Sequence, residues 1–525
     1  MTLDKECAYN AVILARYIMN SGHILIICAS LPTFEYLIMA TDKNVSGLSD
    51  HKLYRKQGKV VAPLNVGIGD QLTLSSWAKE RMPEYLWLGL ILMEYGREDG
   101  FEKAGRILSD ISKNIDSLSQ PQLSKIFALP LDEQKSVYQI ILDEIEAAVL
   151  SPLTVLYHTS QHPEFNLHFN LSEIPFEARL ERLNETIKIY YSQQSNEATD
   201  LRFLALSLHL FGGRVHIASH LTTTTEALSK YPYTSHDDES MRRYRPTIRA
   251  MEGGLTGLEN DPKFSQDFWN RIGMITRCNP MGIIHKENET DYQPFIKQVQ
   301  KILEYVLKSY KHESLSSDKF DVIIGSFAYA LKVFSEVNDK SLGNSVLGRH
   351  AARTIIEILI ILKYLLKREG ENPDVWEEYK LYGIGKYKLI LLKARENNLP
   401  ETAHFFEPIA DALVNEIKWE EFTDVDLKYF DKQGIREKSI EVGEKYLFDL
   451  FYDYDSSFAH GLWGAIRETS MLKCDNASHQ YHTVPDIQLT QTLPDVKSDC
   501  FDIMKKLLEL LKQNYPFPDE LMPAA

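Results

Sequence analysis

The sequence predicts an all-α protein made of several helical bundles, and two observations support this fold class. Apolar residues recur at three- and four-residue spacing over long stretches, as on a helix with one buried face. Strand-like alternation is scarce, and its best example, residues 320–327 (FDVIIGSF), equally suits the start of a helix. Hydrophobic residues make up 44% of the 525 positions and charged residues 25%, as in an ordinary globular chain of roughly two to four domains.

Five stretches carry the helical pattern most clearly. In the first of them Pro83 stands near the start. Proline is tolerated there because the first backbone N–H groups of a helix have no hydrogen-bond acceptor within the helix. The last is stopped by Pro516 and Pro518, which cannot continue a helix. The five predicted helices cover residues 82–98, 101–115, 294–310, 349–366 and 495–515.

Polar stretches near Pro121, at residues 230–246 and at residues 312–319 suggest breaks between parts of the chain. The resulting division has a peripheral N-terminal extension, two helical regions, and a C-terminal helical domain with the candidate site. These four parts are residues 1–45, 46–150, 151–318 and 319–525. Residues 39–52 resemble the polar beginning of an ordinary chain, so Met39 is a candidate functional start.

The formal net charge of −16 argues against broad, sequence-blind binding of nucleic acid. Five cysteines are scattered without a CxxC pair, which predicts reduced thiols and a cytoplasmic protein. Residues 10–31 are apolar overall, but polar residues interrupt them well short of the roughly 20 apolar residues that a membrane-spanning helix needs. We therefore expect no membrane partner and no signal peptide.

The predicted helix at residues 349–366 carries a stripe of charges inside an aliphatic run. Arg349, Arg353 and Glu357 are each four residues apart, so they line one face of the helix. Apolar side chains cover most of the remaining surface, which is typical of a buried helix. Two interpretations stay open: a buried structural ion pair of Arg353 with Glu357, or the polar lining of a cleft between helices.

A second polar set lies at residues 452–468 (YDYDSSFAHGLWGAIRE). On a helix Tyr454, Ser457 and His460 fall within about 120° of one another. Ser456 also lies one turn before His460. Histidine changes charge near neutral pH, which suits a general acid or base. We predict that His460 shares one cleft with the arginine–glutamate stripe; the alternative is a core histidine bonded to a neighbouring helix.

Cys474, His479 and His482 form a third set, with the spacing C-x4-H-x2-H. Three such ligands, with His460 as a fourth, match the chemistry of a zinc site. One short cluster without a second ligand pair is a weak motif. We therefore expect a loop that packs its histidines over the cleft, with no metal and no other cofactor, and keep a metal-dependent hydrolase as an alternative.

Two further basic sets suggest anionic ligands. Gly383 and Gly385 form a predicted turn among lysines that include Lys386, although no complete phosphate-loop motif is present. Residues 242–249 hold four arginines, which indicate either a solvated loop or a contact with an anion or RNA.

The C-terminal region, about residues 321–485, resembles DUF5677, a bacterial family of unknown function. The resemblance rests on GRHAARTIIEILIILKYLL at residues 348–366 and on YDYDSSFAH at residues 452–460. The stretches WEEYKLYGIGKYKL and HQYH look like the version of this family found in longer bacterial proteins. Residues 75–91 (SSWAKERMPEYLWLGLI) look like the N-terminal part of the same long proteins.

The family is distantly similar to HEPN (higher eukaryote and prokaryote nucleotide-binding) helical domains, some of which cleave RNA without a metal. The resemblance therefore implies a HEPN-like C-terminal domain in which His460 moves a proton, Arg353 binds phosphate and Glu357 orients the arginine. Supporting positions are Tyr454 and Ser457, and expected substrate contacts are Arg349, Lys386, His479 and His482.

Three functions follow, and whether the protein is an enzyme stays open. The first is a HEPN-like ribonuclease or toxin effector of phage defence. The second is a non-catalytic helical module that senses a ligand or partner, and the third is the metal-dependent hydrolase. The expected partners are RNA or a nucleotide, together with a second copy of the chain or another protein.

Overall fold

The computed structural model describes residues 76–523 with short gaps, together with a hairpin of strands β1 (Tyr54–Lys56) and β2 (Lys59–Val61). The gaps are residues 216, 218–220, 257–260, 284, 287, 398–403 and 492. The predictions for a peripheral extension at residues 1–45 and for Met39 as a functional start lie outside the described residues.

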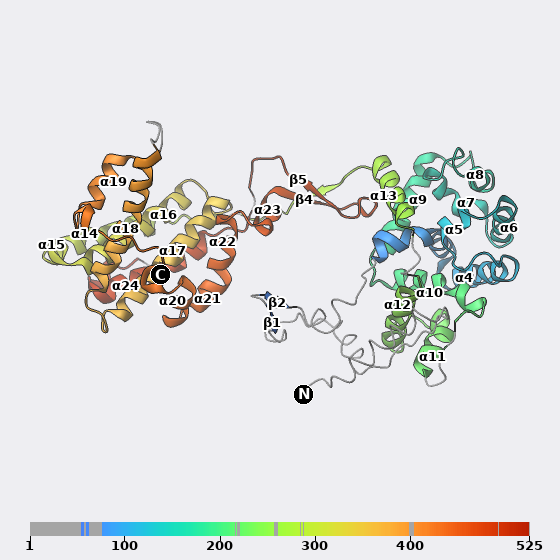
Figure 1. Ribbon diagram of the computed structural model, residues 1–525, viewed down its shortest axis with the longest axis horizontal. Helices are drawn as coiled ribbons and strands as arrows, with labels where there is room; N and C mark the ends of the chain where they lie inside the picture. The colour runs from blue at the N-terminus through green and yellow to red at the C-terminus, as the bar shows by residue number, and fades with distance from the viewer. Residues whose placement is uncertain are drawn as a thin grey trace. The chain divides into compact units, whose positions relative to one another are not determined.

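Helices dominate the described residues, so the prediction of an all-α fold is confirmed (Figure 1). Strands β3 (Pro280–Met281), β4 (Met471–Cys474) and β5 (Thr483–Pro485) form a small sheet in that order, with β4 and β5 antiparallel. Residues 320–327 lie inside helix α16 (Asp318–Asp339) and not in a strand. Within the described part of the chain, no helix combines the length and apolar character that crossing a membrane requires.

The chain folds into two compact units. Among the described residues, those up to Pro280 and residues 474–482 form the N-terminal unit, and residues 281–473 and 483–523 form the C-terminal unit. The border expected at residues 150/151 lies inside the N-terminal unit, where the flanking apolar side chains belong to one core. The border expected at residues 318/319 lies in the first turn of α16, inside the C-terminal unit.

Helix α10 (Asn196–Phe211) lies at the centre of the N-terminal unit and packs against both α4 (Met82–Asn114) and α12 (Met241–Thr256). The helices predicted at residues 82–98 and 101–115 join in α4, where Gly96 at φ 75° redirects the chain. The arginine-rich stretch 242–249 belongs to α12 and is not a loop. The other helices of this unit are η3 (Trp77–Arg81), α5 (Leu123–Phe127), α6 (Leu131–Leu142), α7 (Ala147–Leu150), η4 (Ser151–Val155), α8 (Pro163–Phe169), α9 (Phe176–Tyr191), α11 (Thr222–Lys230), η5 (Tyr231–Tyr233), α13 (Pro262–Ile275) and η9 (Ala477–His479).

Helix α17 (Val346–Arg368) lies at the centre of the C-terminal unit and packs against α16, α20, α22 and α24 (Figure 1). Ser345 caps the N-terminus of this helix, where its hydroxyl accepts a hydrogen bond from the N–H of Gly348 (3.1 Å). The other helices of this unit are α14 (Gln293–Ser309), α15 (Glu313–Ser316), α18 (Val375–Asn397), α19 (Glu407–Val414), η6 (Glu420–Phe422), η7 (Phe430–Lys432), α20 (Ile435–Glu441), α21 (Lys445–Leu447), η8 (Phe448–Tyr452), α22 (Asp453–Ala459), α23 (Trp463–Ser470), α24 (Lys497–Asn514) and η10 (Asp519–Leu521).

The turn predicted at Gly383 and Gly385 is wrong, because both residues lie inside α18. Gly385 is buried where the helix meets another segment of the same unit, and a Cβ atom there would stand 2.5 Å from the carbonyl oxygen of Asp424. Gly385 therefore serves the close approach of a helix to a neighbouring backbone.

Candidate functional site

Arg353 and Glu357 lie one turn apart on α17 and form an ion pair, with 3.4 Å between Arg353 Nη1 and Glu357 Oε2. Their side chains are 26% and 36% exposed. This exposure favours the polar lining of a cleft over a fully buried structural pair, because a core pair would be shielded from water on all sides.

Tyr452, at the end of η8, completes a hydrogen-bonded network with this pair. Arg353 donates to Tyr452 OH (2.6 Å) and to Ser456 Oγ (3.0 Å), and Tyr452 donates to Glu357 Oε2 (3.1 Å). Burial, followed by the negative charge of Glu357, raises the pKa of Tyr452, which keeps the phenol protonated at neutral pH. Sequence reasoning missed Tyr452, although its position one turn before Ser456 on the same stretch was a signal for it.

Glu357 also lines a pocket of about 260 Å³ within the C-terminal unit. The walls of this pocket come from α17, from α18 and from residues 429–438. Aromatic rings and several polar groups share the cavity. The polar and tyrosine side chains at its surface include Glu357, Tyr379, Tyr382, Tyr429, Gln433 and Lys438.

Two polar groups of this pocket differ in how they are satisfied. Gln433 Oε1 is buried, and no hydrogen bond from the described part of the chain reaches it. The Lys438 ammonium donates to the carbonyl oxygens of Phe430 (2.6 Å) and Gln433 (2.7 Å), and burial lowers the pKa of Lys438. A buried acceptor without a partner costs about 1–3 kcal/mol, so Gln433 Oε1 is a locally unfavourable feature beside the pocket.

His460, the predicted proton-transfer group, is exposed and follows the last residue of α22. The side-chain hydrogen bonds of Arg353 and Glu357 among the described residues go to the Tyr452 network and not to His460. The two expected supports also have other partners. Tyr454 donates to a glutamate of α23 (2.7 Å), and Ser457 Oγ lies 3.4 Å from a backbone carbonyl one turn earlier.

Arg349 and Lys386, two expected substrate contacts, are engaged by the protein itself. Arg349 is 5% exposed, donates to the carbonyl oxygen of Pro494 (2.6 Å) and lies 4.0 Å from Asp455. Lys386 donates to two backbone carbonyls within residues 426–428. Both side chains therefore brace neighbouring segments of the C-terminal unit, and a ligand would have to displace those contacts.

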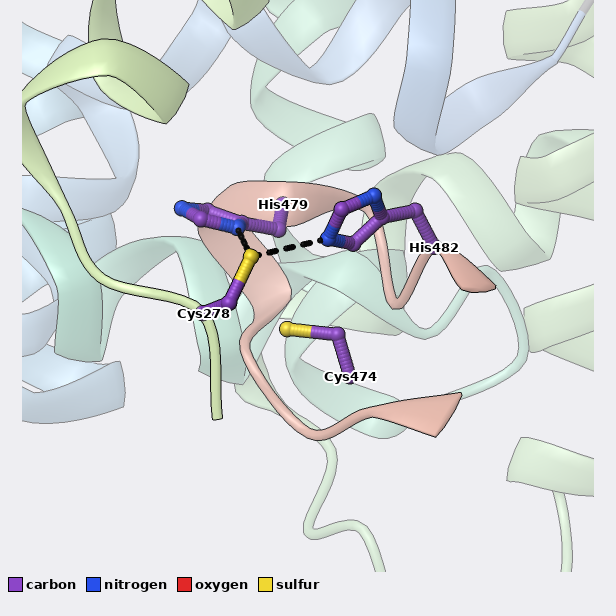
Figure 2. Close-up of side chains that lie close together, drawn as sticks. All are labelled: Cys278, Cys474, His479 and His482. Carbon is purple, nitrogen blue, oxygen red and sulfur yellow. Dashed lines mark hydrogen bonds between the residues drawn. The ribbon is translucent and has the colours of Figure 1, made fainter. Parts of the chain in front are cut away.

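The remaining predicted residues, His479 and His482, belong to the N-terminal unit, where they meet two cysteines (Figure 2). One potential ligand atom from each of the four side chains, including Cys278 and Cys474, lies within 4.8 Å of the others. His460, the fourth ligand considered for the alternative zinc site, is not part of this group, which contains Cys278 instead. The local spacing of residues 474–482 gives no indication of Cys278, because only the fold brings it near.

Comparison with known proteins identifies one relationship. Residues 320–479 match the model of DUF5677, a family of unknown function. The curated proteins and the solved structures with which the chain was compared include no match. This match confirms, for residues 320–479, the resemblance to DUF5677 that the arginine–glutamate helix and the YDYDSSFAH stretch suggested.

Proposed function

We propose that the protein is a cytoplasmic ligand-binding protein and that the pocket of its C-terminal unit accepts the base of a nucleotide. The observation that carries this proposal is the combination, in one pocket, of tyrosine rings with the amide residue Gln433 and the carboxylate residue Glu357. Flat rings and hydrogen-bond acceptors are what proteins use to hold an unstacked base.

The aromatic lining suits a planar ligand. Tyr379, Tyr382 and Tyr429 border the pocket, and Phe430 packs edge-on against Tyr379 with 5.3 Å between the ring centres. Stacking of a base on an aromatic side chain contributes about 1–3 kcal/mol whichever base is present. A volume of about 260 Å³ is small for a drug-sized ligand and suits one base-sized group.

The acceptors predict a preference among bases. Gln433 and Glu357 both border the pocket, and Glu357 is kept in place by Arg353 and by the Tyr452 hydroxyl. Guanine offers an exocyclic amine beside a ring N–H, and such neighbouring donors suit a carboxylate or amide oxygen. We therefore expect guanine nucleotides to bind more tightly than uridine nucleotides.

The same geometry favours binding over catalysis. Each nitrogen of the Arg353 guanidinium faces a protein group: Nε faces Ser456, Nη2 faces Tyr452, and Nη1 faces the paired carboxylate. An arginine that is to steady a phosphate needs donors that point toward the substrate. This arrangement supports the non-catalytic alternative.

A metal-independent ribonuclease of phage defence is the second candidate function. The observation that favours it is that Arg353 donates to the Ser456 hydroxyl, while the carbonyl of Ser456 accepts from the backbone N–H of His460 (3.0 Å). Cleavage would require Arg353 to exchange a protein partner for a phosphate and the imidazole of His460 to turn toward it.

Calorimetric titration of GMP, AMP, CMP and UMP into the full-length protein tests the binding proposal. Tyr382→Ala is expected to weaken GMP binding at least about fivefold, because it removes about 1 kcal/mol or more of stacking. The control is Tyr387→Ala, which changes a tyrosine of the same helix that is 48% exposed and lies outside the pocket lining. Failure of all four nucleotides to bind, or equal affinity of Tyr382→Ala and wild type, would contradict the proposal.

A cleavage assay separates the two candidates. Full-length protein is incubated with a labelled single-stranded RNA in excess EDTA, and His460→Ala is assayed in parallel. Cleavage that disappears in His460→Ala would establish the ribonuclease, whereas intact RNA in both samples would eliminate it.

A further inference from the structure

We propose that Cys278, Cys474, His479 and His482, which we call the Cys2His2 group, bind one zinc ion in the N-terminal unit. All four residues belong to this unit, and both sulfur atoms and one nitrogen of each ring turn toward a common centre (Figure 2). Two thiolates and two imidazoles are a donor set that zinc adopts in structural sites.

The spacing of the donor atoms fits tetrahedral coordination. Cys278 Sγ lies 3.1 Å from His479 Nδ1 and 3.2 Å from His482 Nε2, and all four donors lie within 4.8 Å of one another. With Zn–S near 2.3 Å and Zn–N near 2.0–2.1 Å, tetrahedral sulfur and nitrogen donors stand about 3.5 Å apart. Only small movements of these side chains separate the observed positions from coordination.

A neighbouring hydroxyl orients His479 for this role. Thr276 Oγ1 donates its hydrogen to a backbone carbonyl (2.7 Å), so it accepts from His479 Nε2 (2.8 Å). The proton of the neutral ring is then on Nε2, and the lone pair of Nδ1 faces the sulfur of Cys278. Such a hydrogen bond to the distal nitrogen is usual for histidines that bind a metal.

A backbone amide supports the second sulfur. The N–H of Asn279 points at Cys474 Sγ (3.4 Å), which stabilises negative charge on that sulfur. Cys474 is fully buried, and a buried thiolate is stable only with such donors and a cation nearby.

Four protein ligands close the coordination sphere, which assigns the zinc a structural role. A catalytic zinc keeps one position open for water, and the Cys2His2 group leaves none. The proposed ion therefore gives no support to the metal-dependent hydrolase. It fastens the loop 474–482, which returns from the C-terminal unit, to residues 276–279.

The loop already makes weaker contacts with α9 of the N-terminal unit. Ser478 Oγ lies 2.5 Å from Asn184 Oδ1, and Tyr191 OH donates to the carbonyl of Gln480 (3.1 Å). Gln480 and Tyr481 both adopt left-handed backbone angles, with φ of 55° and 48°. Non-glycine residues in that conformation cost free energy, which the proposed metal bonds offset.

Metal analysis of the purified full-length protein tests the proposal. We expect elemental mass spectrometry to find about one zinc ion per chain. Cys278→Ser and His482→Asn, both at exposed positions, are expected to lose it. The matched controls are Cys500→Ala and His158→Asn. Cys500 is a buried cysteine of the C-terminal unit, and His158 is an exposed histidine of the N-terminal unit. Both control variants are expected to retain the zinc.

Cobalt substitution supplies a second readout. Protein reconstituted with Co²⁺ is expected to show the visible absorption of tetrahedral cobalt with thiolate ligands, and Cys278→Ser is expected to lose it. Far-UV circular dichroism of every variant verifies that the helices persist. The proposal is overturned if wild type neither contains nor takes up zinc, if Cys278→Ser and His482→Asn keep their zinc, or if mass spectrometry finds a disulfide between Cys278 and Cys474.

Discussion

At the scale of single residues, Asp455 links the stability of the C-terminal unit to pH. Its side chain is 2% exposed on α22, and burial raises its pKa to about 7, against the lowering effect of Arg349 and together with the charge of Asp499. An aspartate in an unfolded chain titrates near 3.9, so between these two values the folded state keeps a proton that the unfolded state has lost. The resulting stabilisation is complete below about pH 4 and disappears as the pH rises through 7.

We predict that this group lowers the free energy of unfolding by about 1 kcal/mol between pH 6 and pH 8, or the melting temperature by roughly 2–4 °C. Asp455→Asn imitates the protonated acid and should remove this part of the pH dependence. Asp502→Asn, at an exposed position of α24, should keep the wild-type slope. Thermal melts of the three proteins at several pH values measure the effect, and parallel slopes for Asp455→Asn and wild type would refute it.

The residues of the proposed sites differ in whether the sequence alone could predict their roles. Arg353 and Glu357 form a stripe on one helix, which is a local pattern, and the structure pairs them. Gln433 and Cys278 have no local pattern, because their roles depend on a neighbour that only the fold provides. Arg349 shared the stripe, yet its place is set by tertiary contacts with Pro494 that the sequence does not reveal.

At the scale of elements, α18 shows where local rules fail. Two glycines close together usually indicate a turn, yet Gly383 and Gly385 are helical here. The helices α14 and α24 were predictable because amphipathic spacing is a property of consecutive residues. The packing of α18 against residues 424–425 is a tertiary property, and it explains why a glycine stands at position 385 inside a helix.

The two glycines of α18 provide a matched pair of substitutions. Gly383 is exposed, and a Cβ there meets nothing within 4 Å, so Gly383→Ala should stabilise the C-terminal unit by up to about 1 kcal/mol through helix propensity. Gly385→Ala should destabilise it by about 1–3 kcal/mol, because the new Cβ would stand 2.5 Å from the carbonyl oxygen of Asp424. Denaturant unfolding of both variants measures the difference, and equal stability would show that the close approach relaxes without cost.

At the scale of the whole molecule, the N-terminal unit is not one continuous piece of chain. Residues 474–482 leave the C-terminal unit, complete the N-terminal unit and return. Ala477 joins the main apolar core there, and η9 packs against α9 and α13. From the sequence alone these residues are expected in the C-terminal domain, because the local pattern of a nine-residue loop does not indicate which core it will join.

This organisation predicts a regional response when the loop is replaced. If residues 474–482 are exchanged for a glycine–serine linker of equal length, the N-terminal unit loses the contacts of Ala477 and Ser478 as well as three ligands of the proposed zinc. Amide hydrogen exchange should therefore accelerate in α9 and α13, while α16 and α24 of the C-terminal unit serve as an internal control and keep their protection. Unchanged exchange in α9 and α13 would show that the loop is dispensable for the N-terminal unit. Equal acceleration in all four helices would mean that the loop stabilises both units, which would contradict its assignment to the N-terminal unit alone.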